Sequence, residues 1–119
     1  MPKPIPRQLH GFADYAYAPT IGAAPELFGF ADEPAAKAMC RTIAGTVLGS
    51  TLFTRAEWGL VRVIPMKAHL ALDVAAGAFV MAAPWLFGFA KNTRARNAFL
   101  AFGAVSVVAG SLTRDEEMP

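Results

Sequence analysis

The second half of the chain repeats the first half at a constant offset of 59 residues. Residues 9–55 align with residues 68–114 without a gap, and residues 23–31 (AAPELFGFA) match residues 82–90 (AAPWLFGFA) at all positions but one. Chance does not hold one register over so many uncommon residues. The chain therefore has to fold as two copies of one structural unit, and any site in it is expected in two related halves.

Each copy has the pattern of a helix, a short loop and a second helix. A helix rises 1.5 Å per residue, so a membrane span needs roughly 20 residues. The pattern predicts helices at about 8–30 and 35–54 in the first copy and about 67–89 and 96–113 in the second. We therefore predict an all-α bundle of four transmembrane helices, made of two tandem, parallel helix-pair repeats.

The whole chain is predicted to be one membrane domain. Its parts are repeat one at about 9–55, a linker at 56–67 and repeat two at about 68–114. The linker mixes apolar and charged residues, which is typical of a segment at a membrane surface, although a plain loop explains it equally well.

The composition favours lipid over water as the surroundings. Hydrophobic residues make up 55% of the chain and charged residues 17%, whereas soluble domains have about 45–50% and about 25%. Residues 74–90 and 97–113 carry no charge. The first copy is more polar, because Glu26 and Arg41 interrupt it, so a soluble helical bundle remains an alternative.

The charges point to a lipid bilayer as the partner and away from nucleic acid. The net charge is only +2, and no basic stripe with interleaved aromatics is present. The basic residues gather at the ends of the apolar runs, as in membrane proteins. Their distribution slightly favours a multi-pass protein of the inner (plasma) membrane with both termini in the cytoplasm.

The segment at residues 83–89 (APWLFGF) resembles the signature of the SPW-repeat family of small bacterial and archaeal membrane proteins. The repeat of that family is a pair of transmembrane helices. This chain departs from the signature, because Ala24 and Ala83 stand where serine is typical and Glu26 stands where tryptophan is typical. The resemblance implies a membrane fold and implies no catalysis.

The same motif has a physical interpretation as a helix end with a membrane anchor. Proline lacks an N–H and bends or ends a helix, the aromatic residues (Phe89 among them) suit the headgroup layer, and glycine permits a turn. A ligand site is the sharper alternative. The residues assigned to this motif are Pro25, Phe28, Gly29, Pro84, Trp85, Phe87 and Gly88.

The residues that suggest chemistry are His10, Asp14, His69 and Asp73. Each copy has the spacing H-x-x-x-D, which places histidine and aspartate on one face of a helix, and ionisable groups near lipid are functional candidates. The four could bind zinc, iron or manganese, or His10 and His69 could bind a haem, a quinone or another cofactor. The simpler alternative is a hydrogen bond within each copy. Only if the first helices of both copies meet do the four residues form one site.

Two further features bear on function. Gly45 and Gly49 have the G-x-x-x-G spacing that permits close helix packing, within the bundle or against another subunit. No phosphate-binding loop, nucleophile motif or cysteine pair is present. The leading hypothesis is a non-catalytic accessory or structural subunit of a larger membrane complex or homo-oligomer. A membrane protein that binds metal, haem or quinone is the alternative, and a transporter or channel comes third.

Overall fold

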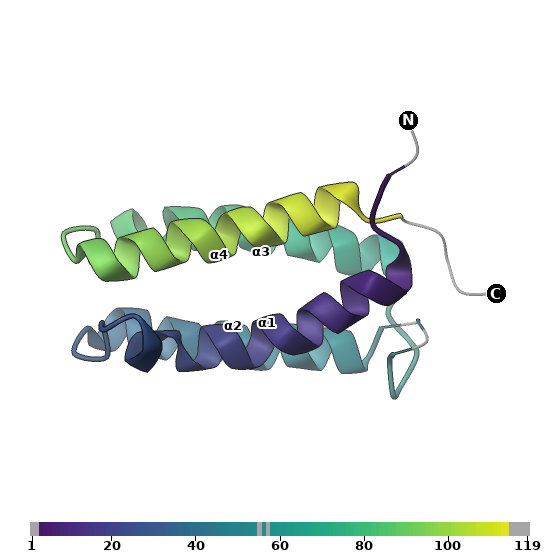
Figure 1. Ribbon diagram of the computed structural model, residues 1–119, viewed down its shortest axis with the longest axis horizontal. Helices are drawn as coiled ribbons and strands as arrows, with labels where there is room; N and C mark the ends of the chain where they lie inside the picture. Colours follow the sequence, from purple (N-terminus) through teal and green to yellow (C-terminus); the bar gives the residue numbers. More distant parts are fainter. Residues whose placement is uncertain (1–2, 55, 57, 115–119) are drawn as a thin grey trace.

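The computed structural model describes residues 3–54, 56 and 58–114, and in these ranges it is an all-α bundle of four helices (Figure 1). The helices are α1 (Arg7–Leu27), α2 (Pro34–Leu52), α3 (Met66–Leu86) and α4 (Thr93–Leu112). The predicted all-α four-helix fold is thus confirmed. Each helix is about 30 Å long at 1.5 Å per residue, close to the thickness of a bilayer core.

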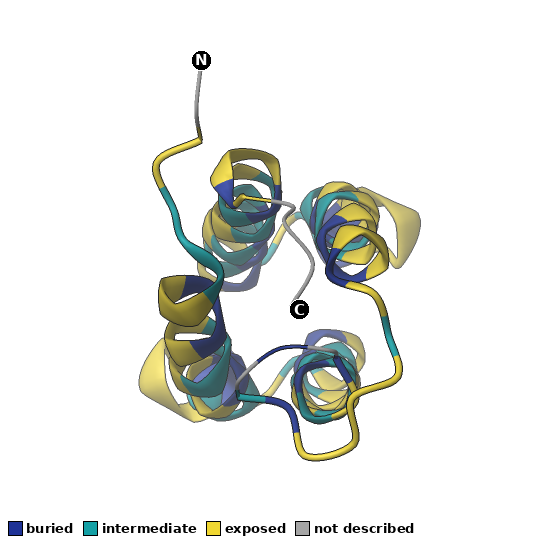
Figure 2. Cartoon of the chain, turned by 90° about the vertical axis from the view of Figure 1, so that its right-hand side faces the viewer, coloured by how far each residue is buried: buried dark blue, intermediate teal, exposed yellow. Residues whose placement is uncertain are grey.

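Each repeat forms a helical hairpin. Helix α1 packs along α2 and α3 packs along α4, and both hairpin loops lie at the same end of the molecule (Figure 1). Viewed along the helices, the buried segments turn toward a common axis (Figure 2). The bundle is elongated, with principal extents of 46 × 30 × 20 Å.

Glycines bring α3 and α4 into backbone contact, but they are not the predicted pair. A Cβ added to Gly77 would lie 2.7 Å from the carbonyl oxygen of Gly103. By contrast, a Cβ added to Gly45 or Gly49 would meet no atom within 4 Å. The prediction that Gly45 and Gly49 pack within the bundle is therefore wrong, because they lie on an open part of α2. Their packing against another subunit stays a prediction.

The repeated motif ends α1 and α3 three residues earlier than predicted, at Leu27 and Leu86. The cause is a left-handed glycine after each helix: Gly29 has φ +78° and Gly88 has φ +77°. In the first copy the Phe30 N–H donates to the Pro25 carbonyl at 2.9 Å, and the equivalent bond in the second copy is also 2.9 Å. This 6→1 bond is that of a Schellman cap, which satisfies a carbonyl at the helix end.

The aromatic residues of the motif divide into two groups. Phe30 and Phe89 turn inward and are 0% and 2% exposed, so the prediction that Phe89 lies in the headgroup layer is wrong. Phe28, Trp85 and Phe87 are about half exposed. These outward residues lie where membrane anchors would be required at this end of the bundle.

At the opposite end, two short backbone pairings close the bundle. Ile5 pairs with Thr113, and Ile64 pairs with Thr54. The two pairings are related by the same 59-residue offset as the repeats. They hold the end of α4 beside the start of α1, and the end of α2 beside the start of α3, which fixes the surroundings of the helix starts.

The two copies differ in how well they suit a membrane. Helices α3 and α4 are long and apolar enough to span one. In the first copy, Glu26 pairs with Arg41, and the offset places Trp85 and Leu100 at these positions in the second copy. The ion pair lowers the hydropathy of the first copy, yet it leaves neither charge without a partner.

Candidate functional site

The four candidate residues meet at the end of the bundle opposite the hairpin loops. His10 and Asp14 lie in the first two turns of α1, and His69 and Asp73 lie in the first two turns of α3. The rings of His10 and His69 are 5.3 Å apart between centroids and stand edge to face. Of the two arrangements left open by the sequence, the structure therefore has the one in which α1 and α3 meet and build a single cluster.

The shortest contacts of the cluster cross between the copies. His10 Nε2 lies 2.8 Å from Asp73 Oδ2, and His69 Nε2 lies 2.8 Å from Asp14 Oδ2. The contacts within each copy are longer, at 3.2 Å for the first copy and 3.3 Å for the second. Each histidine thus bonds chiefly to the aspartate of the other repeat, and the four side chains form a closed ring.

Two threonines set the orientation of the histidine rings. Thr113 Oγ1 lies 2.8 Å from His10 Nδ1, and Thr54 Oγ1 lies 2.7 Å from His69 Nδ1. Each hydroxyl donates its hydrogen to a backbone carbonyl one turn earlier, that of Ala109 or Ser50. Each hydroxyl must then accept from the histidine, so Nδ1 carries a hydrogen and Nε2 is directed into the ring.

The site is shielded from its surroundings. His10 is 1% exposed and His69 is 0% exposed, while the two aspartate side chains are 12% and 13% exposed. Among the described residues, no buried side-chain nitrogen or oxygen lacks a hydrogen-bond partner. A buried polar network is stable only when it is fully satisfied, and this one meets that condition.

Trp58, from the linker, covers one side of the cluster. Its ring lies 5.6 Å from that of His69, and its indole N–H donates to the Arg7 carbonyl at 2.9 Å. Gly11 makes room for it, since a Cβ there would lie 2.2 Å from the indole; the second copy has Leu70 at the equivalent position. This part of the linker is therefore a cover over the site, not a loop detached from the bundle.

A small cavity adjoins the aspartates on the side that faces the middle of the bundle. Its volume is about 40 Å³, and its walls include Asp14, Asp73 and Tyr17. A water molecule needs at least about 10–15 Å³ of such space. The cavity therefore has room beside the carboxylates for a water molecule or a small ion.

The geometry discriminates between the cofactors considered from the sequence. One ligand atom from each of the four side chains can be chosen so that all lie within 4.8 Å of one another, which is the scale of a single metal ion. A haem does not fit between His10 and His69, because the carboxylates of Asp14 and Asp73 occupy the space where the porphyrin plane would have to pass.

A family model for the SPW repeat domain matches residues 8–113. The chain belongs to the SPW repeat family. The matched region contains both histidine–aspartate pairs and both threonines, so the whole cluster lies within the SPW repeats. No curated protein and no solved structure matches the chain. Family membership and the two apolar helices α3 and α4 agree with a small membrane protein.

Three residues that complete this SPW repeat site were not assigned to it from the sequence. Thr54 and Thr113 are equivalent in the repeat, so the alignment of the two copies marked them as a pair. Nothing in the sequence, however, indicated that either threonine contacts a histidine. Trp58 lies in the linker and has no counterpart in the repeat. In the sequence, the position of Trp58 was indicated only by Gly11, which stands where the second copy has Leu70.

Proposed function

We propose that this SPW repeat protein is a small multi-pass membrane protein that binds one divalent transition-metal ion between its two repeats. The observation that carries the proposal is the convergence of four ligand atoms from His10, Asp14, His69 and Asp73 within 4.8 Å. Two neutral imidazoles and two carboxylates balance the charge of a divalent ion, so the bound site is neutral, as a site next to lipid requires.

The threonines support this assignment. A metal-binding histidine usually donates its other ring N–H to a neighbouring oxygen, which fixes the tautomer and aims the lone pair. Thr113 and Thr54 provide that oxygen for His10 and His69. Both Nε2 atoms then point into the ring, where the ion would replace the hydrogens that they donate to the carboxylates, and their directions are set before the ion arrives.

The ligand set suits a small divalent ion such as Zn²⁺, which imidazole and carboxylate both bind. Ligands bonded at 2.0–2.1 Å in a tetrahedron lie roughly 3.4 Å apart. The nitrogen-to-oxygen distances in the ring are 2.8–3.3 Å. Tetrahedral binding would therefore require the adjacent ligand atoms to move apart by a few tenths of an ångström and the remaining pairs, which lie within 4.8 Å, to move closer, both by side-chain rotation.

The proposed role of the metal is structural. A site closed by four protein ligands is typical of structural zinc, whereas catalytic sites keep a position open. The ion would join α1 to α3 and thereby one repeat to the other. A structural metal agrees with a non-catalytic protein. The specificity of such a protein would come from the surfaces that contact its partners and not from a reaction.

We place all four helices across the membrane, with the metal site near the side of the termini. Helices α1 and α2 match α3 and α4 in length, and the charges of Glu26 and Arg41 neutralise each other. The weak excess of basic residues on the termini side puts that side in the cytoplasm of an inner (plasma) membrane. Single cysteines at positions 4 and 93 test this, since an impermeant reagent should label only position 93 in intact cells.

The metal proposal is tested by elemental analysis of protein purified in mild detergent and loaded with Zn²⁺, Mn²⁺ or Fe²⁺. About one ion per chain is expected for the native protein and for Asp32→Asn, an exposed control. Asp73→Asn and His10→Ala should both lose the ion, and His69→Ala should lose it to the same degree as His10→Ala. Native protein that retains none of the three metals would refute the proposal and leave a hydrogen-bonded ring that only joins the repeats.

A further inference from the structure

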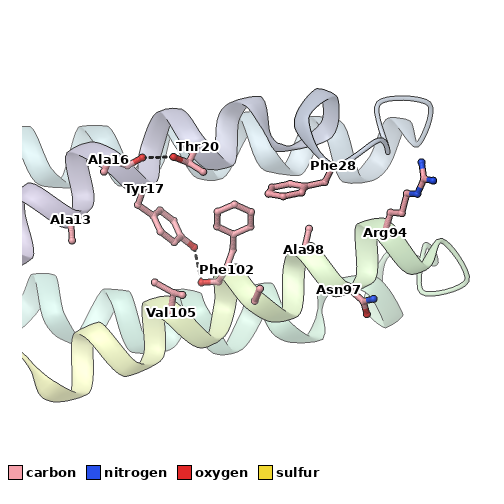
Figure 3. Close-up of a pocket in the computed structure, with 11 residues that line it drawn as sticks. Ala13, Ala16, Tyr17, Thr20, Phe28, Arg94, Asn97, Ala98, Phe102 and Val105 are labelled. Carbon is pink, nitrogen blue, oxygen red and sulfur yellow. Dashed lines mark hydrogen bonds between the residues drawn. The ribbon is translucent and has the colours of Figure 1, made fainter.

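An apolar groove of about 670 Å³ runs between α1 and α4, on the open side of the bundle (Figure 3). Its walls combine small residues of α1, such as Ala13 and Ala16, with Phe102 and Val105 of α4. Phe28 lies at one end, near the hairpin loops (Figure 3). The volume is in the range of sites for small ligands, and the mostly apolar lining suits a hydrocarbon occupant.

The polar groups inside the groove are already used. The Tyr17 hydroxyl donates to the Phe102 carbonyl at 2.8 Å, and the Thr20 hydroxyl donates to the Ala16 carbonyl at 2.6 Å. The Thr20 bond lies within α1, whereas the Tyr17 bond crosses from α1 to α4 (Figure 3). The middle of the groove therefore presents carbon to an occupant, while a polar head placed there would meet hydroxyls that have already donated their hydrogens.

One end of the groove carries a cation. Arg94, in the first turn of α4, lines the groove and is exposed. Its guanidinium lies against Gly29, where a Cβ would be 2.6 Å away, and no carboxylate of the described residues pairs with it. Since α4 is about as long as the bilayer core is thick, Arg94 would stand at the level of the lipid phosphates.

The side chains that line the groove differ from their counterparts on the related seam, between α2 and α3. The 59-residue offset places Leu72 and Phe79 on α3 where α1 has Ala13 and Thr20. It also places Ala35 on α2 where α4 has Arg94. The repeat therefore offers its own comparison: large side chains replace two of the small residues on the related seam, and the cation is missing there.

We infer that this groove binds one acyl chain of an anionic membrane phospholipid, whose phosphate group pairs with Arg94. The inference depends on the membrane position proposed above but not on the metal. The positive charge of Arg94 matches the phosphate of such a lipid. The hydrocarbon lining between Phe28 and Ala13 matches its acyl chain. A lipid enters from the side, because the groove opens along the outer surface of the bundle.

The test is native mass spectrometry of delipidated protein titrated with two lipids that share the same acyl chains, palmitoyl-oleoyl phosphatidylglycerol and palmitoyl-oleoyl phosphatidylcholine. One tightly held phosphatidylglycerol is expected. Arg94→Gln should weaken its retention about fivefold, the effect expected of one basic residue near an anionic lipid. Arg96→Gln, in the same turn of α4 but outside the groove lining, is the matched control and should change little.

A second pair of variants tests the groove itself. Ala16→Phe fills the groove and should abolish the tight lipid, whereas Ala75→Phe makes the same change at the equivalent position of the second copy and should not. Native helicity by circular dichroism in both variants shows that they are folded, and this control is separate from the metal proposal. Equal binding of both phospholipids by native protein, or tight lipid on Ala16→Phe, would refute the inference. So would selective retention of oleic acid or of a quinone in place of phosphatidylglycerol.

Discussion

The crossed pairing of the ring makes a quantitative prediction that a double-mutant cycle can test. His10→Ala removes contacts at 2.8 Å to Asp73 and 3.2 Å to Asp14, and it also leaves the Thr113 hydroxyl without its donor. Removing one partner of a buried charged pair costs about 3–5 kcal/mol. Asp14 is still in contact with His69 in this variant, so we expect a loss near the lower limit, about 3 kcal/mol.

The coupling energies should differ between the two aspartates. Hydrogen bonds to charged groups contribute about 1.5–3 kcal/mol, so His10→Ala combined with Asp73→Asn should show a coupling of about 2 kcal/mol. The longer contact within the repeat predicts less than about 1 kcal/mol for His10→Ala combined with Asp14→Asn. Interhelical hydrogen bonds in a membrane average only about 0.6 kcal/mol, so a value near 2 would identify the crossed bonds as charge-assisted.

The measurement is reversible unfolding in mixed micelles, followed by helicity and carried out with a chelator so that metal does not contribute. The cycle with His69→Ala and Asp14→Asn should give the same coupling as its symmetry mate within about 0.5 kcal/mol. A crossed coupling at or below about 0.6 kcal/mol, or a larger coupling within a repeat than between repeats, would refute the ring as described.

Three further outcomes are expected. Thr113→Val should weaken Zn²⁺ binding by about tenfold or more in a competition titration, because His10 loses the oxygen that orients it; unchanged affinity would show that the threonine has no orienting role. Gly103→Ala should destabilise the protein by about 2 kcal/mol or more in thermal unfolding, since its Cβ would lie 2.6 Å from the Gly77 carbonyl oxygen. Its control, Gly45→Ala, should be neutral or stabilise the protein by up to about 1 kcal/mol. Equal effects of the two substitutions would contradict the packing of α3 against α4. Gly88→Ala should cost about 1–2 kcal/mol from the left-handed backbone alone, because a Cβ there meets no atom within 4 Å; no loss in the same assay would contradict the Schellman cap.

The fold was predictable because the duplication and the length of each helix can both be recognised directly in the sequence. A repeat with an even number of helices, each about as long as a bilayer is thick, leaves little choice besides a four-helix bundle. The helix ends were less predictable. Gly29 and Gly88 could be recognised as turn residues, but a left-handed glycine stops the helix before itself, so Phe30 and Phe89 leave the helix and turn into the core.

The candidate site was predictable only as two halves. The spacing of His10 and Asp14, repeated in His69 and Asp73, places each pair on one helix face. Whether the two faces meet depends on how each hairpin is rotated about the common axis, and local sequence does not specify that rotation. For the same reason, the roles of Thr113 and Trp58 followed only from the structure, since Thr113 contacts His10 at the other end of the chain and Trp58 contacts both α1 and α3.

The symmetry explains why the two proposed sites differ in kind. A two-fold axis brings equivalent residues together only on the axis itself, so a single site shared by both repeats must lie there, and a substitution in either copy damages it. Away from the axis, each copy can change without its counterpart, as Ala13 and Leu72 show on the two seams. A site without symmetry, such as the lipid groove, is therefore built more easily off the axis. A variant that exchanges Ala13 with Leu72 and Thr20 with Phe79 should move lipid binding to the other seam only if Arg94 and Ala35 are exchanged as well, because the hydrocarbon lining and the cation are separate requirements.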